Sequence, residues 1–164
     1  MLRGIHTIRS GFSTSHNPTV PRRYNLDNGN YEVNMRILSI DIMAGIDPGQ
    51  LDMGNHRIMF VLATDAAGAT PTALTGPSEE EEAYQFRFND DRQIGWGTIS
   101  ANYGTELILD PGHIIPEDLY INAWQLGTGG SPELLECPIS FLITMASTKN
   151  TGAEALLYQV KNIN

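Results

Sequence analysis

The chain has 164 residues, a formal net charge of −9 and 18% charged side chains. This length fits one domain that builds its own hydrophobic core, and the single cysteine, Cys137, excludes a scaffold held together by intrachain disulfides. Sixteen glycines and nine prolines with so few charges are typical of a turn-rich globular protein. The composition excludes a coiled coil, a collagen-like chain and a disordered chain.

The charges are unevenly distributed along the chain. No acidic residue precedes Asp27, so the first 23 residues have a charge of +4 and the remaining 141 have a charge of −13. Residues 1–30 are polar and irregular, and we interpret them as an extended N-terminal arm without a core of its own. The arm is predicted to contact a neighbouring subunit through four residues, Arg3, Arg9, Arg22 and Arg23. Contact with nucleic acid is a weaker alternative, because four arginines are sparse for a segment that follows a phosphate backbone.

A period-two pattern of apolar residues begins at Tyr31 and predicts β-strands. The pattern slips by one residue at Leu38, which indicates a β-bulge near Ile37 and Leu38. Residues 57–64 form a mostly apolar run that predicts a strand buried on both faces, and residues 65–78 read as a long loop that is exposed or makes contacts.

The second half of the chain continues the strand pattern. We predict strands at residues 84–88, 94–98, 107–109, 118–126 and 137–145, separated by turns rich in Gly, Pro, Asn and Asp. Gly95 and Gly97 fall on one face of their strand and leave room for a ring or another backbone. Residues 152–162 predict a short C-terminal helix.

These seven or eight strands without βαβ units predict an all-β fold. We expect residues 31–164 to pack as an antiparallel β-sandwich with jelly-roll or another Greek-key topology.

Candidate ligand sites are few and weak. The four histidines are too widely spaced for a local metal motif, and we predict no metal or other cofactor. Asp90 and Asp91 with Asp110 offer oxygen ligands for calcium, but side chains that cap local turn amides are the favoured interpretation. The run of carboxylates at Glu79, Glu80, Glu81 and Glu82 is either a solvated loop margin or an acidic docking strip for the basic arm.

Aromatic residues on strands support a second hypothesis. Trp96, Trp124, Tyr84, Tyr103 and Tyr120 would serve a glycan-binding or attachment module if they were exposed on one face, although core positions are commoner for such residues. No Ser-His-Asp order, nucleophile elbow or phosphate loop is present, so we predict no catalytic residues and no enzymatic activity.

The polar arm, the sandwich pattern, the two lysines and the lack of an export or catalytic signature together resemble small viral coat or virion proteins of the single jelly-roll type. This resemblance covers the architecture of the whole chain and carries over no functional residues. It implies a self-assembling capsid or capsid-associated subunit. Its partners would be copies of itself and other virion proteins.

No signal-peptide pattern and no apolar run long enough for a membrane span occur. The sequence therefore predicts synthesis in the cytoplasm, and the resemblance to coat proteins implies a host cell and a final location in a virion.

Overall fold

The protein is described by a computed structural model that covers residues 2–14, 20–26, 33–44, 57–70, 72–74, 83–85, 90–100, 104–126 and 137–149. All regular elements in these ranges are β-strands, and no helix occurs within them, which confirms the all-β prediction. The helix predicted for residues 152–162 lies outside the described ranges.

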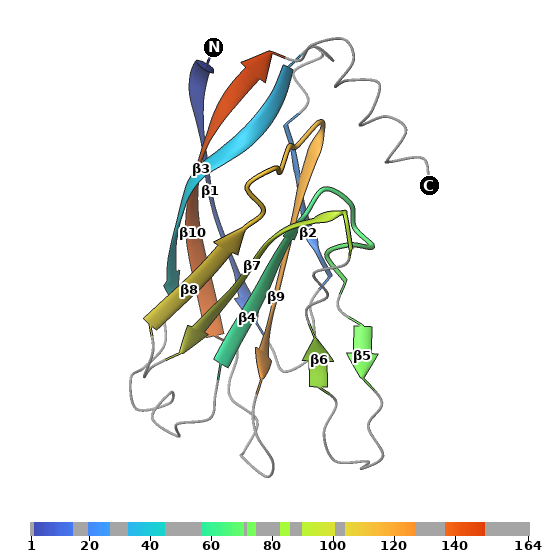
Figure 1. Ribbon diagram of the computed structural model, residues 1–164. Helices are drawn as coiled ribbons and strands as arrows, with labels where there is room; N and C mark the ends of the chain where they lie inside the picture. The colour runs from blue at the N-terminus through green and yellow to red at the C-terminus, as the bar shows by residue number, and fades with distance from the viewer. Residues whose placement is uncertain are drawn as a thin grey trace.

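Ten strands follow one another along the described chain (Figure 1). They are β1 (Leu2–Thr14), β2 (Arg22–Asn25), β3 (Val33–Ala44), β4 (Arg57–Ala63), β5 (Thr72–Leu74), β6 (Ala83–Gln85), β7 (Gln93–Ser100), β8 (Gly104–Leu109), β9 (Asp118–Leu126) and β10 (Cys137–Lys149). The strands predicted around residues 57–64, 118–126 and 137–145 match β4, β9 and β10 closely.

Two antiparallel sheets contain eight of these strands. We call the three-stranded sheet β1-β10-β3 sheet A and the five-stranded sheet β2-β9-β4-β7-β8 sheet B. A separate two-stranded hairpin joins β5 and β6. Sheets A and B pack face to face over one shared core, as in a β-sandwich (Figure 1).

The strand pairs are nested along the sequence. The first strand pairs with the last, β2 pairs with β9, β4 pairs with β7, and β5 pairs with β6 at the centre. A pairing of β3 with β8 would complete this series. In its place, an isolated bridge joins Met35 of β3 to Ile115, which follows β8. The chain is therefore arranged as one long hairpin folded onto itself.

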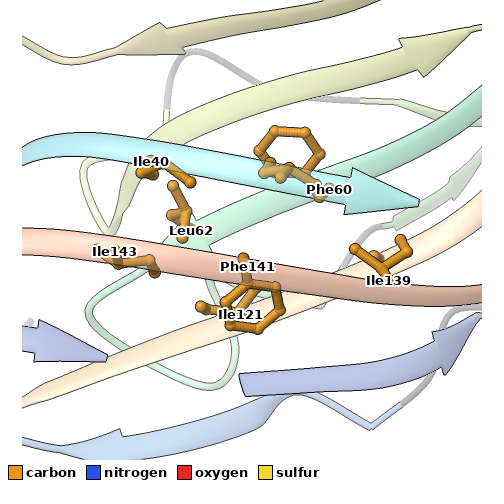
Figure 2. A pocket seen from close by; sticks show the side chains of 9 residues that line it. Ile40, Phe60, Leu62, Ile121, Ile139, Phe141 and Ile143 are labelled. Atoms are coloured by element: carbon orange, nitrogen blue, oxygen red, sulfur yellow. The ribbon is translucent and has the colours of Figure 1, made fainter. Parts of the chain in front are cut away.

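Alternating side chains from both sheets form the core between them. Ile139, Phe141 and Ile143 of β10 are buried there, together with Phe60 and Leu62 of β4 and Ile121 of β9 (Figure 2). Burying each such side chain contributes about 1.5–3 kcal/mol. The cavity that remains among them has a volume of about 10 Å³ and only apolar lining, so it is a dry packing gap without room for a ligand.

The predicted β-bulge is present in β3. Met145 of β10 pairs with Ile37, and the preceding Thr144 pairs with Ser39, so Leu38 has no partner. Leu38 is half exposed, whereas Ile37 is buried. The slip in the hydrophobic pattern marks this bulge because the extra residue exchanges the two faces of the strand.

The segment predicted as an N-terminal arm lies largely within the sandwich. β1 pairs with β10 from Leu2 to Thr14, and β2 pairs with β9. The Tyr24 hydroxyl of β2 donates a hydrogen bond to Ser10 Oγ of β1 at 2.6 Å, so the segment also connects the two sheets. These polar strands can join the sheets because β10 and β9 supply the backbone hydrogen bonds that the segment alone cannot make.

Candidate functional site

The outer face of sheet A carries a series of exposed side chains. Side chains alternate across a sheet, so the residues between the buried ones of β1, β10 and β3 point away from the core. We call this surface the A face and define it by Ile5, Thr7, Arg9, Gly11, Ser39, Asp41, Met43, Ser140, Leu142 and Thr144. Within this set Arg9 and Asp41 are charged, and Arg36, which shares the rung of Ile5 through Ala146, adds a third charge at one end of the face. Ile5 and Met43 are 73% and 75% exposed.

The register of sheet A places two charged residues of the A face, Arg9 and Asp41, on one rung. Arg9 pairs with Leu142, and Leu142 pairs with Asp41 on its other side. Arg9 therefore lies on one edge strand and Asp41 on the other, about 10 Å apart across β10. Both side chains are exposed, and no salt bridge joins either of them to another described residue.

The four arginines predicted to reach a neighbouring subunit have different surroundings. The guanidinium of Arg23 forms a salt bridge at 2.8 Å with Asp118 of β9, and this hydrogen bond and charge raise the pKa of Arg23. Arg9 and Arg22 are exposed. The side chain of Arg3 and the acidic run at residues 79–82 lie outside the part of the chain whose side chains are described. Arg23 therefore stabilises its own sandwich through β9, a role that the sequence did not reveal.

The two tryptophans predicted for a glycan platform are buried. Trp124 is fully buried and Trp96 is 8% exposed, in a second apolar cluster with Val61, Ala63 and Ala69. This cluster lies on the face of sheet B opposite the main core, because its residues alternate with the core residues of β4 and β9. Indoles in this position cannot stack on a sugar, so they do not support the ligand-binding hypothesis.

The turn after β4 covers this second cluster through hydrogen bonds from polar side chains. Gln93 Nε2 donates to the carbonyl of Gly68 at 2.8 Å, and Asn122 Nδ2 donates to the carbonyl of Ala69 at 3.0 Å. The indole of Trp96 donates to Gln93 Oε1 at 2.8 Å. Residues 68 and 69 of the predicted surface loop are therefore buried, because the backbone there accepts hydrogen bonds from sheet B.

His113 is a buried connection between the two sheets. Its Nε2 accepts a hydrogen bond from the backbone N–H of Ile37 at 2.9 Å, beside the bulge in β3. A ring nitrogen that accepts carries no proton, so the proton of the neutral ring is on Nδ1, which faces the carbonyl of Asp110. His113 therefore satisfies a backbone N–H that the irregular edge of β3 would otherwise leave unpaired.

The carboxylates considered for calcium cap local turns. Asp90 accepts from the backbone N–H of Arg92 at 3.1 Å and forms a bidentate pair with its guanidinium, with two distances of 2.8 Å. The arginine holds the pKa of Asp90 below its usual range. Asp110 accepts from the backbone N–H of Gly112 at 2.8 Å. No group of three or more metal-ligating side chains occurs among the described residues, and the two turns have the capping role that was favoured.

No protein-family model matches the chain, and neither a curated protein nor a solved structure shows significant similarity to it. None of the described residues belongs to a helix long and apolar enough to cross a membrane. The function is therefore inferred from surfaces and charges.

Proposed function

We propose that this protein is a self-assembling structural subunit, and that its specific role is that of a viral coat or capsid-associated protein located in the virion. The observation that carries the proposal is the A face, a sheet surface with exposed Ile5 and Met43 and with three charged residues, Arg9, Asp41 and, at one end, Arg36. Ile5 and Met43 lie near opposite ends of this face, and we take them as apolar contact points for a neighbouring molecule. The partners are copies of this chain and other virion proteins.

The topology supports a coat role by analogy of fold. Folding a long hairpin so that its nested pairs are shared between two sheets is the construction of a jelly roll, and we propose that topology here. The nesting of β1 with β10, β2 with β9 and β4 with β7 fits it. Capsid proteins use the jelly roll as a rigid unit, but so do lectins and cupins, so the fold narrows the function without assigning it.

The edge of sheet A offers a second route to assembly. β1 is an edge strand of 13 residues, and no described strand pairs with its outer side. Long edge strands template pairing with other chains unless lysine, proline or inward charges protect them. Arg9, one of the four arginines predicted to reach a neighbour, lies on this strand and is exposed.

The direct test is the mass of the full chain in solution as a function of concentration. We expect sedimentation velocity to show species larger than the monomer, and negative-stain microscopy to show regular shells or rings. A chain that stays monomeric up to its solubility limit would contradict the proposal. Deleting residues 2–23 is not a clean test, because the deletion removes β1 from sheet A and exposes β10.

A further inference from the structure

We infer that the A face is a two-fold contact between two copies of this chain, in which Arg9 of each copy faces Asp41 of the other. This inference rests on the proposed function and specifies one of its contacts. Its basis is the rung Arg9–Leu142–Asp41, which places opposite charges at equal distances from the central strand β10.

The symmetry follows from this arrangement. Suppose two A faces meet with a two-fold axis in the plane of contact, parallel to β10. The axis exchanges the two edge strands, so β1 of one copy lies over β3 of the other. Arg9 then lies over Asp41 of the partner subunit and Asp41 over Arg9 of the partner subunit, while the two Leu142 side chains meet on the axis.

The alternative two-fold axes are disfavoured by charge. An axis in the same plane but perpendicular to β10 places β1 over β1, and centred on this rung it brings the two Arg9 side chains together and the two Asp41 side chains together. Facing like charges are repulsive, so the charge pattern selects the axis parallel to β10. Both axes keep the strands of the two sheets aligned, as packed sheets prefer, so charge alone distinguishes them.

Side-chain size agrees with the same axis. Ser140 pairs with Gly11 on one side and with Met43 on the other, so this pair forms the neighbouring rung of the A face. The exchange of edge strands brings the exposed Met43 over Gly11 of the partner subunit, where no side chain opposes it. On the other side of the charged rung, Thr7–Thr144–Ser39 carries only small hydroxyl side chains. The next rung, Ile5–Ala146–Arg36, brings Ile5 over Arg36 of the partner subunit.

The size of the contact predicts its strength. Three strands spaced about 4.8 Å apart and some nine residues long cover about 400 Å² per copy. A standard stable interface buries about 800 Å² per partner, so this contact is weak as an isolated pair. It acts in an assembly where each subunit makes several contacts. Because two exposed ion pairs orient it, salt should weaken it.

Charge reversal tests the contact without disturbing the core, because Arg9 and Asp41 are both exposed. When two R9D chains meet, a carboxylate at position 9 faces a carboxylate at position 41. When two D41R chains meet, a guanidinium group at position 9 faces a guanidinium group at position 41. Mixing the two variants restores opposite charges at both positions. D91R is the matched control, because Asp91 is exposed, lies on the turn before β7 and undergoes the same change of charge.

The measurement is sedimentation velocity of the full chain at about 0.01 M and at higher ionic strength, where screening is stronger. We expect R9D and D41R each to weaken association about tenfold, D91R to leave it unchanged, and an equimolar mixture of R9D and D41R to recover it. If R9D and D41R associate as the unchanged chain does, or if their mixture does not recover association, the inference is wrong while the structural role stands. If the unchanged chain is monomeric, both are wrong.

Discussion

The ring of Phe60 on β4 lies across Gly97 of β7, its partner in the antiparallel register. A methyl group added at Gly97 would overlap the Phe60 ring. Leu62 and Leu109 similarly occupy the space over Gly95, at 2.7 Å and 2.8 Å from where a Cβ would stand. The two glycines of β7 therefore bring large side chains of the neighbouring strands close to its backbone, and the inner side of sheet B is packed accordingly.

Gly97→Ala should lower the free energy of unfolding by about 1–3 kcal/mol, because the added methyl group overpacks the core against Phe60. Urea unfolding measures the change. Gly112→Ala is the matched control, since a Cβ at Gly112 meets only Asp110 Oδ1 at an ordinary 3.5 Å. Adding Phe60→Leu to Gly97→Ala should relieve part of the loss. Strict additivity of the two substitutions would show that the ring and the methyl group do not compete for space.

His113→Ala should destabilise the fold by about 1–3 kcal/mol, because it leaves the buried N–H of Ile37 without its acceptor. His6→Ala is the control, as His6 is exposed on β1. Denaturant titration of both variants tests the difference. Equal stabilities for the two would mean that His113 does not hold the edge of β3.

The pair between Asp90 and Arg92 should make a pH-dependent contribution to stability. The arginine lowers the pKa of Asp90 in the folded state, so the contribution is present above the ordinary pKa of aspartate and is lost as the pH falls through the lower folded value. Asp90→Asn keeps an oxygen for the N–H of Arg92 but removes the charge. The variant should be less stable than the unchanged chain at pH 7, and the gap should close below about pH 4.

This pH dependence has a simple control. Asp91→Asn changes the adjacent exposed carboxylate, which makes no hydrogen bond to Arg92. The midpoints of urea unfolding are compared at pH 7 and below about pH 4 for the unchanged chain, Asp90→Asn and Asp91→Asn. A gap for Asp90→Asn that is the same at both values would refute the role of the charge.

The tryptophan fluorescence should report two buried indoles. We expect acrylamide to quench the folded chain weakly and the emission to shift to the red on unfolding, because Trp124 is fully buried and Trp96 nearly so. Trp96→Phe and Trp124→Phe, measured separately, assign the signal to each indole. Strong quenching in the folded state, or an emission change on adding oligosaccharides, would revive the glycan-binding hypothesis.

Strands in which apolar and polar residues alternate strongly could be predicted from the sequence alone. The phase slip at Leu38 located the bulge, and the pair of glycines in β7 indicated the close approach that Phe60 makes. Both features are local, since they follow from the pleat of a single strand. The turn roles of Asp90 and Asp110 are equally local, because each side chain bonds a backbone N–H two residues ahead.

The polar strands β1 and β2 were not predicted as part of the sandwich. Their sequences contain few apolar residues, and their hydrogen-bond partners, β10 and β9, lie more than 90 residues further along the chain. The burial of His113 likewise depends on the meeting of the turn after β8 with the edge of β3. Propensity in a short window cannot report such partners.

The sequence by itself determined the all-β class, the positions of most strands and the bulge, because each depends on side-chain alternation within one strand. Only the tertiary structure decided which strands pair and which surfaces remain open. Arg9 and Asp41 are 32 residues apart in the sequence, and nothing local relates them. They share one rung because β10, the last described strand, inserts between the strands that carry them.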